Sequence, residues 1–160
     1  MSDTSDLAAS EDRPMPRRAA GPGQLVPAWR VALTITWIGA FLGFAAVWKA
    51  SEEIGIATWW LGPRSDPRPL LVTLVPFAIT IAAGVTAAYN LPSAVWVSLA
   101  GSGGCALVGV FDISRSGGLA FVELAIAAAT ALVALGALSG RYRAAPAGGV
   151  TDEEPSTSDR

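Results

Sequence analysis

The run GLAFVELAIAAATALVALGAL, residues 118–138, decides the fold class, because Glu123 is its only charged residue. An α-helix rises about 1.5 Å per residue, so about 20 residues cross the roughly 30 Å hydrocarbon core of a bilayer. This run therefore predicts a helix that spans a membrane, and the rest of the chain can be compared with it.

Three further stretches have a similar length and a similar apolar character. Residues 29–48 begin and end with tryptophan, as expected where a helix meets the two faces of a bilayer. Residues 70–89 carry no charge and contain Pro76, which predicts a kink that neighbouring helices can accommodate. Residues 93–111 are rich in glycine, but helix is still expected because unpaired backbone groups are costly in lipid. We therefore predict an all-α integral membrane four-helix bundle over residues 28–143.

The segments outside these four spans are polar or short. Residues 1–27 and 144–160 combine low hydrophobicity with proline or charge, which predicts disordered tails. Residues 51–61 in the first loop are too few to span and contain two adjacent tryptophans, which predicts a short helix in the headgroup region. The proline-rich run 63–69 cannot be helical, and we expect it to be extended.

The charge pattern favours cytoplasmic termini. Four spans place both chain ends on one side, where six basic residues lie near the membrane against four on the other side. Basic residues are enriched in cytoplasmic loops, so we expect both tails in the cytoplasm of a cell whose plasma membrane holds the protein. The six are Arg13, Arg17, Arg18, Arg30, Arg141 and Arg143, and the four are Lys49, Arg64, Arg68 and Arg115.

The composition excludes much of enzyme chemistry. The chain has no histidine and one cysteine, Cys105, so the usual zinc and iron–sulfur sites and a Ser–His or Cys–His nucleophile cannot form. Cys105 lies among small apolar residues, where a thiol behaves as a small hydrophobe. The basic residues form no dense run, so nucleic-acid binding is unsupported. We predict a protein that is not an enzyme and that has no cofactor and no metal.

Glu123 is the residue most in need of an explanation. It lies about five residues inside the last span, and ionisable groups at membrane depth are rare and are usually paired or functional. In one interpretation it pairs with an arginine near the interface, Arg115 being the nearest in sequence, and fixes the first loop over the bundle. In the other it lines a polar cavity and binds a proton, a cation or a substrate. Asp112, at the end of the third span, competes for the same cations.

The first loop offers a second candidate site. Trp59 and Trp60 precede a segment that carries Arg64 and Arg68, and all four are predicted on the outer side of the membrane. This segment is interpreted either as an interfacial linker that sets the approach to the second span or as a site for a lipid headgroup or a protein partner.

Small residues at four-residue spacing occur in every predicted span. Since apolar burial cannot drive helices together inside lipid, close backbone contact through such residues predicts a tight bundle, with or without further copies of the chain. The pairs are Gly39 and Gly43, Thr80 and Gly84, Ala83 and Ala87, Ala100 and Gly104, Ala125 and Ala129, and Gly136 and Gly140.

Two passages carry a resemblance to a known kind of protein. Residues 59–69, Trp-Trp-Leu-Gly-Pro-Arg-x-x-Pro-Arg-Pro, lead into an apolar span with a proline, and residues 121–125 read Phe-Val-Glu-Leu-Ala. They resemble small four-helix membrane proteins of actinobacterial type whose activity is uncharacterised. The resemblance covers roughly residues 28–143 and implies four spans in a bacterial plasma membrane. It implies no activity and no functional residue.

Three hypotheses of function follow from these observations. The first is a non-enzymatic accessory or scaffold subunit whose partners are the bilayer and another protein or a second copy. The second is a small transporter or channel component that uses Glu123 as its polar group. The third is a lipid-acting enzyme with acidic residues as acid and base at the outer interface, for which the sequence fixes no spacing. Its candidate acids are Glu52, Glu53, Asp112 and Glu123.

Overall fold

The computed structural model describes residues 21–142, and within this range every regular element is a helix. The predicted all-α class is therefore confirmed for this part of the chain, whereas most of the two tails predicted as disordered lies outside it. The helices are α2 (Pro27–Ile54), α3 (Leu70–Thr73), α4 (Val75–Ala88), α5 (Ala94–Asp112) and α6 (Gly117–Ala137).

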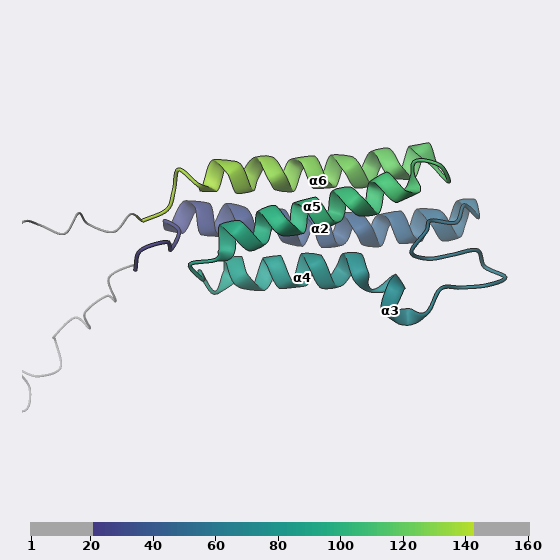
Figure 1. Ribbon diagram of the computed structural model, residues 1–160, viewed down its shortest axis with the longest axis horizontal. Coiled ribbons are helices and arrows are strands. Elements are labelled where there is room, and N and C mark those ends of the chain that lie inside the picture. The colour runs from purple at the N-terminus through teal and green to yellow at the C-terminus, as the bar shows by residue number, and fades with distance from the viewer. Residues whose placement is uncertain (1–20, 143–160) are drawn as a thin grey trace, which may run out of the picture.

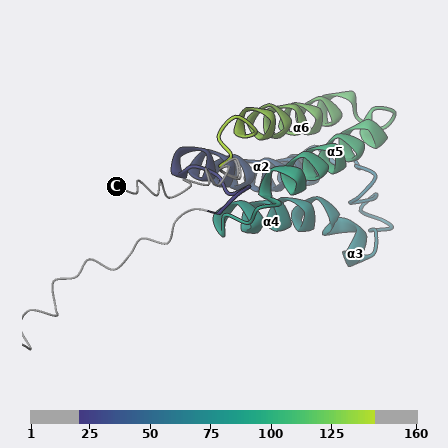
Figure 2. The same cartoon turned by 60° about the vertical axis from the view of Figure 1, so that its left-hand side comes forward.

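The four longer helices run side by side, with neighbours in opposite directions (Figure 1). Helix α2 packs against α4 and α6, and α5 packs against the same two helices, so the four form a ring. The long α2–α3 loop and the α5–α6 turn lie at one end of the ring. The α4–α5 turn and both ends of the described chain lie at the other end, as the turned view also shows (Figure 2).

Helix α2 is longer than the apolar run that predicts it. It begins at Pro27, where the missing N–H costs nothing, and continues to Ile54. The Lys49–Glu53 ion pair of 3.2 Å, at a spacing of four residues, supports the added turns. Gly55 then ends the helix with a positive φ of 76°.

The predicted interfacial helix at residues 51–61 is wrong. Residues 51–54 belong to the last turn of α2, and residues 55–61 form turns and irregular backbone. Gly55 and Gly62 both have positive φ, which a continuous helix cannot contain. Residues 63–69 are non-helical, as expected from their prolines.

The second apolar stretch is interrupted at Leu74. Pro76 has no N–H to donate to the carbonyl four residues earlier, and its ring crowds the preceding turn. The chain therefore divides into the single turn of α3 and the 14-residue α4, although Ala78 N still donates to Leu74 O at 2.8 Å. The kink expected from Pro76 is present as this break.

The segment before α2 is ordered, which corrects the prediction of disorder for residues 21–27. Leu25 forms an antiparallel bridge with Arg141, and its side chain is buried. Gly23 N donates to Tyr142 O at 2.8 Å. Asn90 in the α4–α5 turn accepts from Leu25 N at 2.8 Å and donates to Leu25 O at 3.2 Å. These backbone pairs between distant segments have no signature in local composition.

Large side chains of α2 fill the centre of the ring. Leu33, Trp37 and Phe44 are buried, and Trp37 Nε1 donates across the ring to Ser98 Oγ of α5 at 3.0 Å. A Cβ on Gly101 of α5 would lie 3.0 Å from the Trp37 ring. A small residue thus admits the indole, although Gly101 belongs to none of the small-residue pairs on which the sequence prediction rests.

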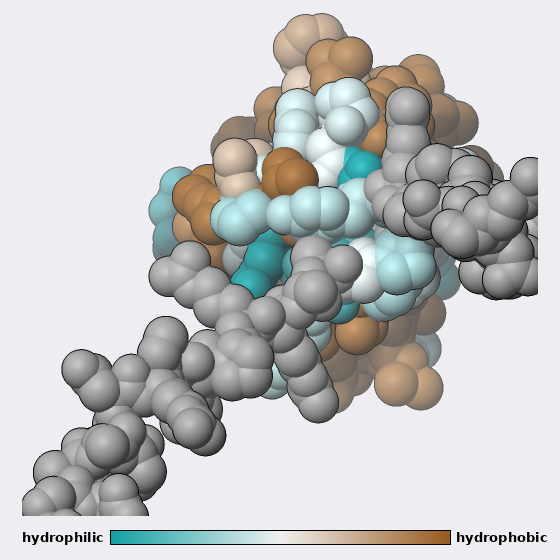
Figure 3. Space-filling model, turned by 90° about the vertical axis from the view of Figure 1, so that its left-hand side faces the viewer, coloured by the Kyte–Doolittle hydropathy of each residue, from teal (hydrophilic) through white to brown (hydrophobic). Residues whose placement is uncertain are grey.

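The outer faces of the helices are strongly apolar. Leu71, Phe121 and Leu132 expose 83%, 73% and 69% of their surface. Within residues 21–142, α2, α5 and α6 are each long and apolar enough to cross a membrane, whereas α4 is shorter. Viewed from the end with the termini, pale and teal polar residues form a cap and brown apolar residues surround it (Figure 3). Such a distribution suits contact with lipid.

Candidate functional site

The α5–α6 turn brings the two acidic candidates together. Asp112 is the last residue of α5, and Glu123 follows in the second turn of α6. The turn between them is tight, because Arg115 N and Ser116 N both donate to Asp112 O. Ser116 Oγ also accepts from Leu119 N at 3.4 Å and caps α6. Both carboxyl groups are completely buried, with 0% exposure.

The tryptophan pair of the first loop covers these acids. Trp60 Nε1 donates to Glu123 Oε1 at 3.0 Å, and Trp59 N donates to Asp112 Oδ1 at 2.6 Å. Trp59 Nε1 also donates to Val108 O of α5 at 3.0 Å. The two candidate sites proposed from the sequence, the intramembrane acids and the loop tryptophans, are therefore one site.

Trp60 belongs to the core rather than to a headgroup layer. Its side chain is completely buried, and its ring lies edge-on to Phe44, Trp48 and Phe77, with centroids 6.4, 6.5 and 6.0 Å away. Thr73 of α3 donates to Trp60 O at 3.3 Å. Trp59 is half-buried beside the exposed ring of Phe111, at 5.7 Å. The indole of Trp60 can thus supply a donor to Glu123 from an otherwise apolar cage.

The part of the chain that the structure describes does not contain the ion pair between Glu123 and an arginine that one interpretation of the sequence predicted. Arg115 is exposed, and its Nη1 donates to Phe111 O at 3.5 Å instead. Over residues 21–142, Lys49 and Glu53 make the one ion pair, and it lies on the surface. The physical reason is local: the loop delivers an uncharged N–H donor to each acid, so no cation has to enter the apolar interior.

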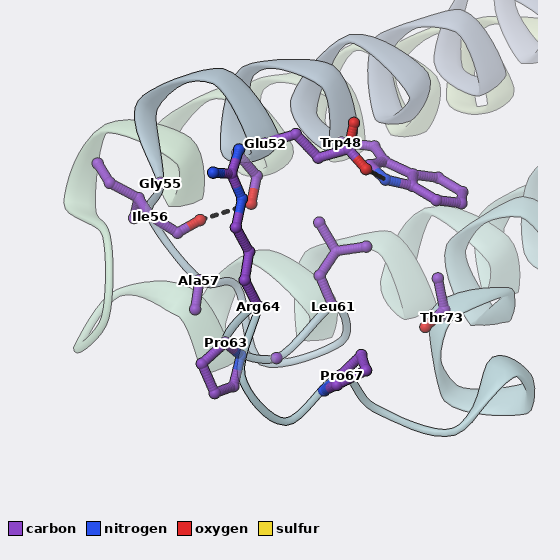
Figure 4. Close-up of a pocket in the computed structure, with 12 residues that line it drawn as sticks. Trp48, Glu52, Gly55, Ile56, Ala57, Leu61, Pro63, Arg64, Pro67 and Thr73 are labelled. Carbon is purple, nitrogen blue, oxygen red and sulfur yellow. Dashed lines mark hydrogen bonds between the residues drawn. The ribbon is translucent and has the colours of Figure 1, made fainter.

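The loop arginines separate into two surface grooves. Arg68 and Arg115 line a groove of 480 Å³ with Trp59 and Phe111. Arg64 instead extends across a different groove of 290 Å³, toward the end of α2 that carries Trp48 (Figure 4). The structure therefore associates Arg68 with Arg115 and does not associate it with Arg64.

One oxygen of each buried acid remains without a donor. Asp112 Oδ2 and Glu123 Oε2 receive no hydrogen bond from an N–H or O–H group of the described residues. The two side chains are nevertheless within hydrogen-bond reach of each other. A buried acceptor that stays unpaired costs about 1–3 kcal/mol, and more if it is charged, so this contact determines what the site can do.

Sequence reasoning missed Thr73 and Trp48 as members of this site. Thr73 closes the loop by its bond to Trp60 O, and Trp48 forms one wall of the cage around the Trp60 ring. Trp48 resembled an ordinary interfacial aromatic residue in the sequence, and no local signal distinguished Thr73. Cys105 is buried, in line with the interpretation of its thiol as a small hydrophobe.

Comparison of the chain with protein-family models, with curated proteins and with solved structures gave no match. Fold and site must therefore define the class of protein by themselves. An all-helical arrangement with three long apolar helices, exposed apolar faces and a polar cap indicates a membrane protein.

Proposed function

We propose that the protein crosses a plasma membrane four times. Residues 70–88 of α3 and α4 supply the fourth span, since they would extend about 28 Å at helical rise, close to the thickness of the hydrocarbon core. Their backbone break lies at Leu74, which is 40% exposed, beside buried Thr73. Leu74 N donates to Leu70 O and Ala78 N donates to Leu74 O, so backbone pairing continues across the break, as lipid requires.

Both termini lie on the cytoplasmic side in this proposal. Arg30 and Arg141, together with the basic residues of the flanking tails, favour that end as the inner one. The loop with the tryptophan pair Trp59 and Trp60 then faces outward. The resemblance to small actinobacterial membrane proteins supports a bacterial plasma membrane.

Within that membrane, the protein acts as a non-enzymatic accessory or scaffold subunit that binds a transmembrane helix of a partner. One observation carries this proposal: α2 and α6 form a groove of 420 Å³ with small residues along it. Gly39, Ala125 and Ala129 line it, and a Cβ on Gly39 would have no atom within 4 Å. Close approach of backbones through such residues is the usual mode of helix association in lipid.

Gly43, the second glycine of the Gly39–Gly43 pair, already packs against another helix of the same chain. A Cβ on Gly43 would lie 2.7 Å from Ile126 Cδ1 of α6, so this glycine serves packing within the chain. Gly39, one turn away, is left open toward the outside of the ring. The burial of Glu123 beneath Trp60 also favours a structural role for the acid over a transport route.

Purification in mild detergent tests this proposal. We expect a stable partner or a defined oligomer to co-purify with the parent chain and to be lost from Gly39→Leu, because the added side chain fills the groove. Gly103→Leu is the matched control: Gly103 is also a helical glycine at which an added Cβ would meet no atom within 4 Å, but it lies on α5.

Gly103→Leu should retain the complex. A second copy of the chain in the complex would identify the partner helix as its own. A monodisperse monomer without a partner, or a complex that survives Gly39→Leu unchanged, would contradict the proposal.

A further inference from the structure

The carboxyl groups of Asp112 and Glu123 form a closed polar site with an unusual balance of donors. Each group accepts one hydrogen bond from the first loop, through Trp59 N and Trp60 Nε1. Asp112 Oδ2 and Glu123 Oε2 then remain without a donor, although both side chains are completely buried. The two acids face each other from consecutive helices, within hydrogen-bond reach.

An ionised carboxylate accepts hydrogen bonds and cannot donate one. Two ionised carboxylates in contact would therefore leave two acceptors unpaired and would place two negative charges together in an apolar interior, which is strongly unfavourable. A single added hydrogen removes both problems, because a protonated carboxyl can donate to the other acid.

The surroundings do not neutralise the pair in another way. Arg115 acts on Asp112 from the surface, where its side chain is exposed. The Cys105 thiol of α5 is the other titratable group beside Glu123, and α2 contributes the rings of Phe44 and Trp48 through the cage around Trp60. Of the charged groups of α2, Lys49 and Glu53 pair with each other on the surface, Glu52 accepts from Trp48, and Arg30 lies in the first turn at the opposite end of the helix.

A bound metal ion is disfavoured by the same groups. Within residues 21–142, no three acidic, cysteine or histidine residues are grouped in a way that could hold one. On the loop side each acid faces an N–H donor, which cannot ligate a metal ion. A proton needs no ligands beyond the carboxyl oxygens that share it.

We propose that Asp112 and Glu123 form a proton-binding site that holds one proton between the two carboxyl groups, and that this proton keeps the loop of residues 55–69 closed over the bundle. The proton comes from water, and the occupied site carries one negative charge instead of two. Oδ2 and Oε2 are the oxygens left free to share it.

Loop closure depends on the proton because the loop makes its bonds to the same two groups. When the proton leaves, the two carboxylates repel each other and must separate or admit water. Either change disturbs the acceptors of Trp59 N and Trp60 Nε1. The site thus couples proton occupancy to the position of the tryptophan pair, independently of which partner binds the outer surface of the bundle.

Infrared spectroscopy of the full chain in lipid nanodiscs tests the proton directly. At neutral pH we expect a C=O band of a buried, protonated carboxylic acid that shifts in heavy water. Glu123→Gln and Asp112→Asn should each abolish this band, because one acid then remains and accepts a hydrogen bond from the new amide.

Asp66→Asn is the control: Asp66 is an exposed acid of the same loop, so this variant should retain the band. A parent chain without such a band at neutral pH overturns the proposal, and so does a band that survives in both variants.

Amide hydrogen exchange, corrected for the intrinsic effect of pH, tests the coupling to the loop. In the parent and in Asp66→Asn, protection of residues 55–69 should fall as the medium becomes alkaline and the carboxylic band disappears. Glu123→Gln should keep the loop protected over the same range, since its amide can donate to Asp112 at any pH. That result also shows that the variant folds. A parent loop equally protected after the band is lost, or lost protection in Glu123→Gln at neutral pH, would refute the coupling.

Discussion

At the scale of single residues, the bond from Trp60 Nε1 to Glu123 Oε1 is the contact on which the buried site depends most. It gives one oxygen of a buried carboxyl a donor without a cation, and the rings around Trp60 fix the direction of its N–H. Glu123 could be selected from the sequence because a charge inside an apolar run is rare. Its partner could not be predicted, since that depends on the path of a loop about 60 residues earlier in the chain.

Replacing Trp60 with phenylalanine tests this contact. The variant keeps most of the ring packing but removes the donor to Glu123, so we expect the free energy of unfolding to fall by about 1–3 kcal/mol. Unfolding in mixed micelles, followed by circular dichroism, measures the change.

Trp96→Phe is the matched control, because Trp96 is 57% exposed and its ring faces Arg141 at 5.8 Å. This substitution should have little effect on stability. An equal loss of unfolding free energy in the two variants would mean that the hydrogen bond from Trp60 to Glu123 does not stabilise the protein.

At the scale of helices, the contact between α5 and α6 positions the acids. Gly109 of α5 allows this contact, because a Cβ there would lie 2.9 Å from Leu124 Cγ, 3.1 Å from Leu124 N and 3.2 Å from Glu123 Cβ. Sequence patterns predicted small residues at helix contacts in general. They did not single out Gly109, since α5 contains several glycines and only the packing distinguishes them.

Gly109→Ala should therefore disturb the site through the backbone. Besides the Leu124 side chain, the added methyl group meets Leu124 N and Glu123 Cβ, which cannot rotate away, so we expect a loss of about 1–3 kcal/mol in unfolding free energy. Gly103→Ala on the same helix meets no atom within 4 Å and should stay within about 0.5 kcal/mol of the parent. Thermal unfolding of both variants in one detergent gives the comparison. A Gly109→Ala variant as stable as Gly103→Ala would show that α5 and α6 can separate freely here.

At the scale of the whole molecule, residues 21–142 close a ring of four helices, with both ends of this described range at one face. The apolar stretches and their approximate limits could be predicted, because length and charge alone determine what lipid accepts. The ordered segment before α2, its bridge to Arg141 and the clamp by Asn90 could not, because each joins parts far apart in the sequence. The same holds for the fold-back of the first loop, which turned an expected surface helix into the cover of a buried site.

Thiol labelling in intact cells tests the four-span topology most directly. Cys105 is buried and is first replaced by alanine; single cysteines are then introduced by Asp66→Cys in the first loop and Ser139→Cys after α6, both at exposed positions. With four spans these sites lie on opposite sides of the membrane, so an impermeant reagent should label the first from outside and the second only after permeabilisation. If α3 and α4 do not cross, the two sites share one side, and equal labelling of both in intact cells would contradict the four-span arrangement.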